Sequence, residues 1–125
     1  MAHIYLFVPL ALAELNTFTS IGNDYNFDQI FEKQVQALGQ PADLLIAIST
    51  SGNSKNVNNA IMAAKEKNMH IIGLSGNNGG QMSDLLQDQI NIIIPSAKTA
   101  YIQETHIMVL HIICKLIDQG LFGDK

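Results

Sequence analysis

Three short apolar runs constrain the fold of this chain more than any other feature. They cover Leu44–Ile48, residues 70–74 and Ile90–Ile94, and Pro95 ends the last of them. Continuous apolar runs of this length are typical of strands buried on both faces, as in a parallel sheet with helices on either side. A similar stretch, residues 4–13, predicts an earlier strand.

Segments with helical periodicity lie between these runs. Apolar residues recur three or four positions apart in 27–38 and in 55–68, and a short helix is predicted over 80–87. The longest helix is predicted over about 100–117, ending near Gly120. Strands that alternate with helices form βαβ units, whose right-handed crossovers build a parallel sheet. The sequence therefore predicts an α/β fold, a three-layer αβα sandwich around a doubly wound parallel sheet.

Length and composition fit one compact domain over residues 1–125. A hydrophobic share of 47% and a charged share of 14% are typical of globular chains. The net charge is −4 and no basic run occurs, which argues against an electrostatic nucleic-acid surface. Since the sequence contains no arginine, a bound anion must be held by hydroxyls, backbone N–H groups, helix N-termini, lysine or a metal.

Two further features bear on the compartment. The single cysteine, Cys114, excludes an internal disulfide and lies in an apolar run, which predicts a buried structural thiol. The apolar stretch at residues 4–15 lacks the Lys or Arg of a signal peptide and is interrupted by Pro9. It is also shorter than the ~20 residues that span a bilayer. A cytoplasmic protein with no membrane contact is the expectation.

The segment Ser49-Thr50-Ser51-Gly52-Asn53-Ser54, here called the serine loop, has the composition of an anion site. It follows the clearest predicted strand and leads directly into a helix, and ligands of open α/β sheets bind beyond the carboxyl ends of strands. Its hydroxyls can donate to phosphate oxygens, its glycine allows close backbone approach, and the next helix presents free N–H groups. The alternative is an ordinary turn with Ser54 as the helix N-cap.

At the serine loop the chain resembles the sugar isomerase (SIS) domain, and within that superfamily it is most similar to the phosphoheptose isomerases. Further matches are residues 21–25 (Ile-Gly-Asn-Asp-Tyr), Gly79-Gly80, and the helix from Ile102 through His106 to His111. The resemblance extends from about Ser20 to the C-terminus, with the motifs in the family's order and at nearly its spacing.

The resemblance implies an isomerase that interconverts sedoheptulose 7-phosphate and D-glycero-D-manno-heptose 7-phosphate through an enediol. That reaction leads to the heptose of the lipopolysaccharide core. The members of that family are zinc enzymes that assemble as homotetramers, with active sites between subunits. The implied phosphate contacts are Ser49, Thr50, Ser51 and Ser54. The implied sugar contacts are Asn23 and Asp24, the implied zinc ligands are Gln103 and His111, and His111 is also the implied acid/base.

The residues themselves leave several of these roles open. Asn23 and Asp24 also suit a turn or N-cap ahead of the next helix, and a histidine such as His111 more often packs in an interior than binds a metal. Gln103 and His111 are eight residues apart, about 12 Å of helix rise, so they cannot chelate as an i, i+4 pair does. His106, one turn from Gln103, is interpreted as a supporting or interface residue.

The first residues depart from the family's pattern. Phosphoheptose isomerases carry an N-terminal helical segment with a Gly-Ser phosphate contact and two zinc ligands, a His and a Glu, and residues 1–19 do not match it. Two of four zinc ligands are thus expected to be absent, and we expect phosphate binding to survive while zinc-dependent isomerisation is impaired. The alternative is a non-catalytic SIS protein similar to the DnaA initiator-associating protein. The C-terminal end of that protein resembles residues 116–118 with Leu121 and Phe122 of this chain.

Overall fold

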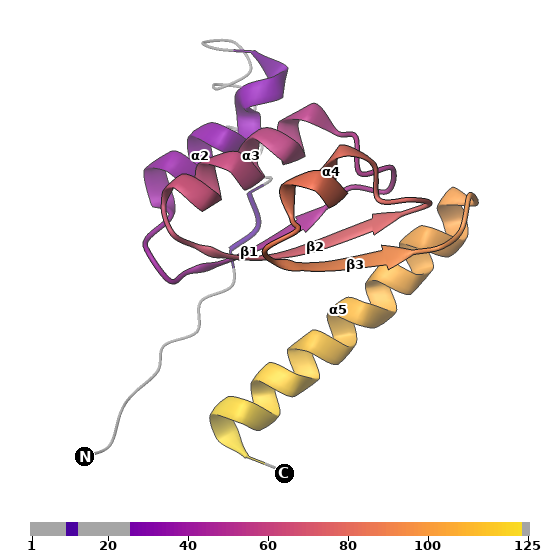
Figure 1. The fold of residues 1–125 in the computed structure, drawn as a ribbon. Helices are drawn as coiled ribbons and strands as arrows, with labels where there is room; N and C mark the ends of the chain where they lie inside the picture. Colours follow the sequence, from indigo (N-terminus) through magenta and orange to yellow (C-terminus); the bar gives the residue numbers. More distant parts are fainter. Residues whose placement is uncertain (1–9, 13–25, 124–125) are drawn as a thin grey trace.

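The computed structural model describes residues 10–12 and 26–123 of the chain (Figure 1). Most of the strand predicted at 4–13 lies outside these ranges, and residues 10–12 are not in a strand. Asn23 and Asp24 also lie outside the described residues, so their predicted sugar contacts stay predictions.

The described strands form one parallel sheet in the order β1-β2-β3. β1 spans Leu44–Ile48, β2 spans His70–Gly76 and β3 spans Ile90–Ile94. The bounds of β1 and β3 agree with the predicted apolar runs, while β2 continues to Gly76, two residues beyond its predicted end. All three strands end at the same edge of the sheet, which is therefore where the strand-to-helix loops gather.

Helices cover both faces of this sheet, which confirms the predicted α/β class (Figure 1). One face carries a 3-10 turn, η1 (Phe27–Gln29), and three helices. These are α2 (Ile30–Leu38), α3 (Lys55–Glu66) and α4 (Gly80–Leu85). The other face carries α5, Thr99–Phe122, which contacts β2 and β3. The sheet is thus the middle of three layers.

The core lies between the sheet and the α2, α3 and α4 layer. Ile61 of α3, Ile71 of β2 and Leu86 after α4 have relative exposures of 0%, 1% and 1%. Full burial of such a side chain stabilises a fold by about 1.5–3 kcal/mol. Because these residues come from successive elements, the core holds the βαβ units together and so positions the loops at the carboxyl edge.

The α5 helix corrects two predictions. It does not end near Gly120 but continues to Phe122, and Gly123 with φ +77° follows as its C-cap. An exposed glycine within a helix costs only about 1 kcal/mol, so it does not by itself end one. The prediction that Cys114 is buried is also wrong, because its thiol is exposed. Ile112 in the same run is also exposed, while Ile113 is half-buried.

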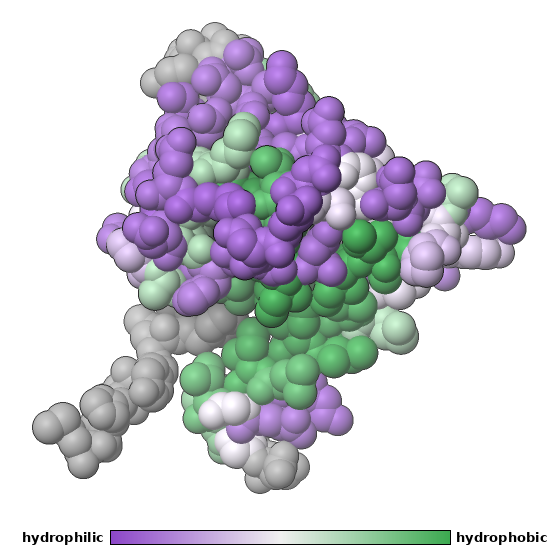
Figure 2. All heavy atoms as spheres, viewed as in Figure 1, coloured by the Kyte–Doolittle hydropathy of each residue, from purple (hydrophilic) through white to green (hydrophobic). Residues whose placement is uncertain are grey.

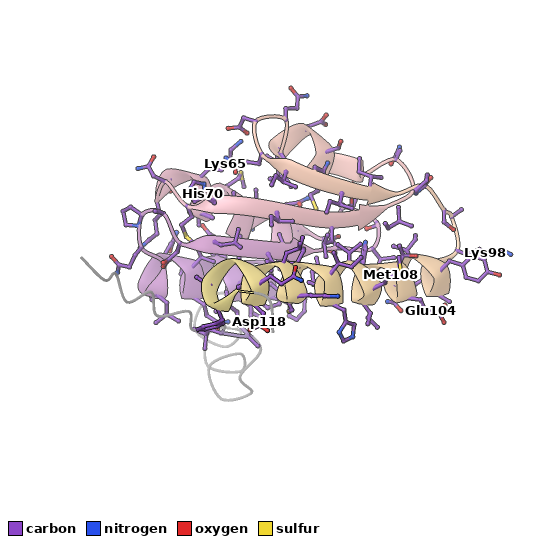
Figure 3. The ribbon with its side chains drawn as sticks, turned by 90° about the horizontal axis from the view of Figure 1, so that it is seen from below. Lys65, His70, Lys98, Glu104, Met108 and Asp118 are labelled. Carbon is purple, nitrogen blue, oxygen red and sulfur yellow. The ribbon has the colours of Figure 1, made fainter. Side chains whose placement is uncertain are left out.

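Most of α5 is apolar and uncovered. Only Ile102 and His106 are buried within this described helix, whereas Ile107, Met108 and Leu116 are more than half exposed. Figure 2 shows the resulting apolar surface below the sheet, and Figure 3 shows α5 along the sheet with Lys98 and Asp118 near its opposite ends. By length and composition alone, α5 would also suffice to cross a bilayer. An exposed apolar surface of this kind is typical of a site of interaction with another molecule.

Candidate functional site

A hollow of about 330 Å³ lies at the carboxyl edge of the sheet. Three loops contribute to it, one after each strand. Its lining residues are Thr50, Ser51, Ser54, Asn77, Ala97, Thr99 and Ile102. Four of these seven side chains carry a hydroxyl and one an amide, so the hollow offers hydrogen bonds rather than formal charge.

Two helices begin at this hollow. Ser54 is the N-cap of α3, and Thr99 is the first residue of α5. The first N–H groups of a helix have no partner within the helix, and they carry the positive end of its dipole. Neither helix has a side-chain hydrogen bond at its N-cap. Both N-termini are therefore suited to an anion in the hollow.

Ser49 lies beneath the serine loop, with 4% of its surface exposed. Its Oγ accepts hydrogen bonds from the backbone N–H groups of Gly52 at 3.1 Å and Ser54 at 3.3 Å. Both lone pairs are then occupied, and the Ser49 hydroxyl donates to Ser54 Oγ at 2.9 Å. Since Ser54 Oγ accepts that bond, its own hydrogen is available to a ligand in the hollow.

Backbone contacts hold the serine loop against the turn before α4. The Gly52 carbonyl accepts hydrogen bonds from Met82 N–H at 2.9 Å and from Asn58 Nδ2 at 3.3 Å. Gly52 has φ +72°, and a Cβ at this position would overlap the carbonyl oxygen of Gly79. Gly80 likewise lies against the backbone of Ser51. The loop and the turn thus pack backbone against backbone, with no room for a side chain at either glycine.

Two lysines lie near the helix N-termini but do not line the hollow. Lys55, the first residue of α3, forms an ion pair with Asp28 at 2.9 Å, and this hydrogen-bonded carboxylate raises the pKa of Lys55. Lys98 is the N-cap of α5, and its Nζ lies 4.9 Å from the centre of the Tyr101 ring. The groups that line the hollow and could hold an anion are therefore hydroxyls and helix N-termini rather than cationic side chains.

Gln103 and His111, the predicted zinc ligands, are both exposed on α5. Within the described ranges, no group of three or more His, Cys, Asp or Glu side chains lies close enough together to hold a metal ion. Zinc sites in proteins commonly use three or four protein ligands. Gln103 and His111 therefore do not make a zinc site on their own, and any site that includes them needs donors from elsewhere.

The family model of the SIS domain matches residues 1–76, which is more than half of the chain. The chain belongs to the SIS domain family. Curated relatives of this SIS domain include the phosphoheptose isomerase of Chromohalobacter salexigens, 56% identical over 88% of this chain and 56% of the relative. That of Bordetella avium is 52% identical over 94% of this chain and 62% of the relative. The chain thus spans less than two thirds of the length of these relatives.

A solved structure agrees with the sequence comparison. The phosphoheptose isomerase GmhA from Neisseria gonorrhoeae superposes with a TM-score of 0.86 at 47% sequence identity. The match covers 88% of this chain and 61% of the other. The similarity in fold and sequence therefore holds across nearly all of this SIS domain.

The structure brings Thr50, Ser51 and Ser54 together, with Ser49 behind them, and it adds two polar residues that the sequence reasoning missed. Asn77 and Thr99 belong to different loops, and the Asn77 N–H donates to the Ser96 carbonyl at 3.1 Å. Their signal in the sequence was available, because each follows a predicted strand and parallel strands end at one edge. Gln103 and His111 do not line the hollow of this SIS domain.

Proposed function

We propose that this SIS domain binds a sugar phosphate in the hollow and belongs to a phosphoheptose isomerase. The reaction would interconvert sedoheptulose 7-phosphate and D-glycero-D-manno-heptose 7-phosphate, a step toward the heptose of lipopolysaccharide. The observation that carries the proposal is the convergence of the Thr50, Ser51 and Ser54 hydroxyls with two helix N-termini. The names of the relatives support the reaction class.

A phosphate suits this hollow better than a neutral or cationic group. The Ser54 hydrogen is free to be donated, and the N–H groups at the starts of α3 and α5 add donors whose dipoles favour negative charge. Hydrogen bonds to a charged acceptor contribute about 1.5–3 kcal/mol each. Thr50 and Ser51 supply further hydroxyls, while Ser49 acts through Ser54 and the loop backbone.

Removing one of these donors tests phosphate binding directly. Ser54→Ala is expected to weaken the affinity for inorganic phosphate about ten-fold or more, because one charge-assisted hydrogen bond is lost. Titration of the folded protein with phosphate, followed by NMR chemical shifts, measures this. Thr105→Ala is the matched control, since its exposed hydroxyl bonds to the Tyr101 carbonyl outside the hollow. Equal phosphate affinity of Ser54→Ala and the unmodified protein would contradict the proposal.

Isomerisation places further demands on the protein. An aldose–ketose conversion moves a proton between adjacent carbons, so it needs an acid/base and a group that polarises the carbonyl. We assign the acid/base role to His111, because an imidazole side chain can both donate and accept a proton. A bound zinc would supply the polarisation. Gln103 and His111 would contribute to its coordination, and the family's other two zinc ligands, a His and a Glu, belong to a segment that residues 1–19 do not match.

Phosphate contacts without a full set of zinc ligands predict that the 125-residue chain binds the sugar phosphate but isomerises it inefficiently. Purified protein is expected to bind sedoheptulose 7-phosphate but to isomerise it poorly with added zinc, and to contain well below one zinc ion per subunit. A coupled turnover assay and metal analysis measure these quantities. Full activity from this chain, or stoichiometric zinc that survives His111→Ala, would contradict the assignment of the missing donors.

We also propose that the domain is a cytoplasmic homo-oligomer, with the tetramer as the family's form. The exposed apolar side chains of α5 support a protein partner over open solvent. A second copy of the chain can cover that helix. The single Cys114, an exposed free thiol, fits a reducing compartment.

A further inference from the structure

The buried residues of helix α5 that contact the sheet come from a single turn of the helix. Its two buried residues, Ile102 and His106, are four positions apart and so lie on one face of the helix. The Ile102 side chain occupies the space beside Gly76, where a Cβ would overlap it. His106 has 3% of its surface exposed, and its Nε2 lies 2.8 Å from the carbonyl oxygen of Ser75. The contact therefore joins the start of α5 to the end of β2.

The hydrogen bond also determines the tautomer of His106. A carbonyl oxygen only accepts, so Nε2 must carry the hydrogen. In the neutral imidazole Nδ1 is then an acceptor, and it is buried without a hydrogen-bond partner among the residues that the structure describes. Burial of an unpaired polar atom costs stability, and an apolar side chain at this position would avoid that cost. The imidazole is therefore explained by the directional bond it makes to Ser75.

This bond lies directly behind the hollow. Ser75 is two residues before Asn77, and His106 is one helical turn after Ile102 and two turns after Thr99; Asn77, Ile102 and Thr99 all line the hollow. The apolar contact of Ile102 alone is non-directional and would allow the helix to slide or rotate on the sheet. The His106 bond to a backbone carbonyl restricts both movements, since a hydrogen bond weakens steeply with misalignment.

We propose that His106 is a positioning residue for the phosphate site: it holds the first two turns of α5 so that Thr99 and the helix N-terminus face the serine loop. The role rests on the proposed function of the hollow and deepens it. His106 itself does not line the hollow, so it acts on the ligand only through α5.

Three substitutions separate this role from general stability. In His106→Gln the side-chain amide can donate to the Ser75 carbonyl as the imidazole Nε2 does. The side chain of His106→Asn is too short to reach that carbonyl, and the side chain of His106→Leu has no hydrogen-bond donor. Exposed His70 gives the control His70→Gln. Inorganic phosphate affinity is measured by NMR titration at a temperature where each variant is fully folded. We expect His106→Leu and His106→Asn to lose about five-fold or more in affinity, the worth of about 1 kcal/mol, and His106→Gln to stay within about two-fold of the unmodified protein.

Amide hydrogen exchange without ligand gives a second readout that does not depend on phosphate. The Leu and Asn variants are expected to lose protection in the first turns of α5 relative to α3, and the Gln variant to recover it. Leu and Asn variants that fold and keep both affinity and protection would overturn the proposal, as would a Gln variant as impaired as they are. If the unmodified protein does not bind phosphate, the proposed function fails, while the exchange data still decide whether His106 positions α5. Should His106→Leu not fold, the Gln and Asn pair decides the question.

Discussion

Gly52→Val is expected to abolish phosphate binding and to lower the melting temperature by more than about 10 °C. Gly52 has φ +72°, where a non-glycine residue costs about 1–2 kcal/mol. A Cβ there would also overlap the Gly79 carbonyl oxygen, so the serine loop and the turn before α4 must separate. The two effects together are on the order of 3–5 kcal/mol, comparable to the largest single-residue losses. For a domain of this size, each kcal/mol corresponds to several degrees.

The control for this substitution is another glycine of the same chain. Gly120 lies within α5, and no atom is found within 4 Å of a Cβ built there. Gly120→Ala is therefore expected to stabilise the helix by about 0.5–1 kcal/mol and to leave phosphate affinity unchanged. Thermal melts followed by circular dichroism and phosphate titrations measure both variants. A Gly52→Val protein that melts and binds like the unmodified chain would show that the loop does not depend on this backbone conformation.

Leu116→Glu is expected to convert an oligomer into monomers. Leu116 is 60% exposed in the single chain, and Ile112 and Met108 extend the same apolar surface at intervals of four residues. If a second copy covers this surface, the substitution removes about 1.5–3 kcal/mol of apolar burial for each copy and places a charge in its stead. The dissociation constant should rise roughly 100-fold or more. Size-exclusion chromatography with light scattering measures the mass over a concentration series.

Gln119→Glu is the matched control, since it introduces the same charge at an exposed polar position of α5. It should keep the mass of the unmodified protein. Two results would argue against self-association through α5: a monomeric unmodified chain across the series, or a Leu116→Glu protein of undiminished mass. A monomeric unmodified chain would indicate that a different protein is the partner that covers the helix.

The strands were more predictable than the ends of the helices. Leu44–Ile48 and Ile90–Ile94 agree with prediction because each apolar run stops at a residue that changes the local chemistry, Ser49 or Pro95. The end of α5 was not predictable from Gly120, because glycine both ends helices and is tolerated inside them. Gly123, with its positive φ, follows the last turn instead.

The exposure of Cys114 shows a further limit of periodicity. An apolar run predicts burial, but it does not say which neighbour provides it. Among the described residues, buried side chains of α5 come from one turn only, and the rest of the helix is exposed or half-buried. The same pattern of residues is compatible with a core helix and with an interface helix.

The local features of the serine loop that suit an anion were evident from the sequence alone. A strand, four hydroxyl residues, a glycine and a helix start occur within a dozen residues, and their roles follow from local backbone geometry. Only the tertiary structure decided that Ser49 faces inward and that Asn77 and Thr99 complete the hollow. It also decided that His106 of α5 meets the Ser75 carbonyl beside that hollow. These outcomes depend on contacts between segments that are far apart in the sequence, such as the bond from His106 to the Ser75 carbonyl, 31 residues away. Local periodicity does not encode such contacts, because packing of the whole domain selects them.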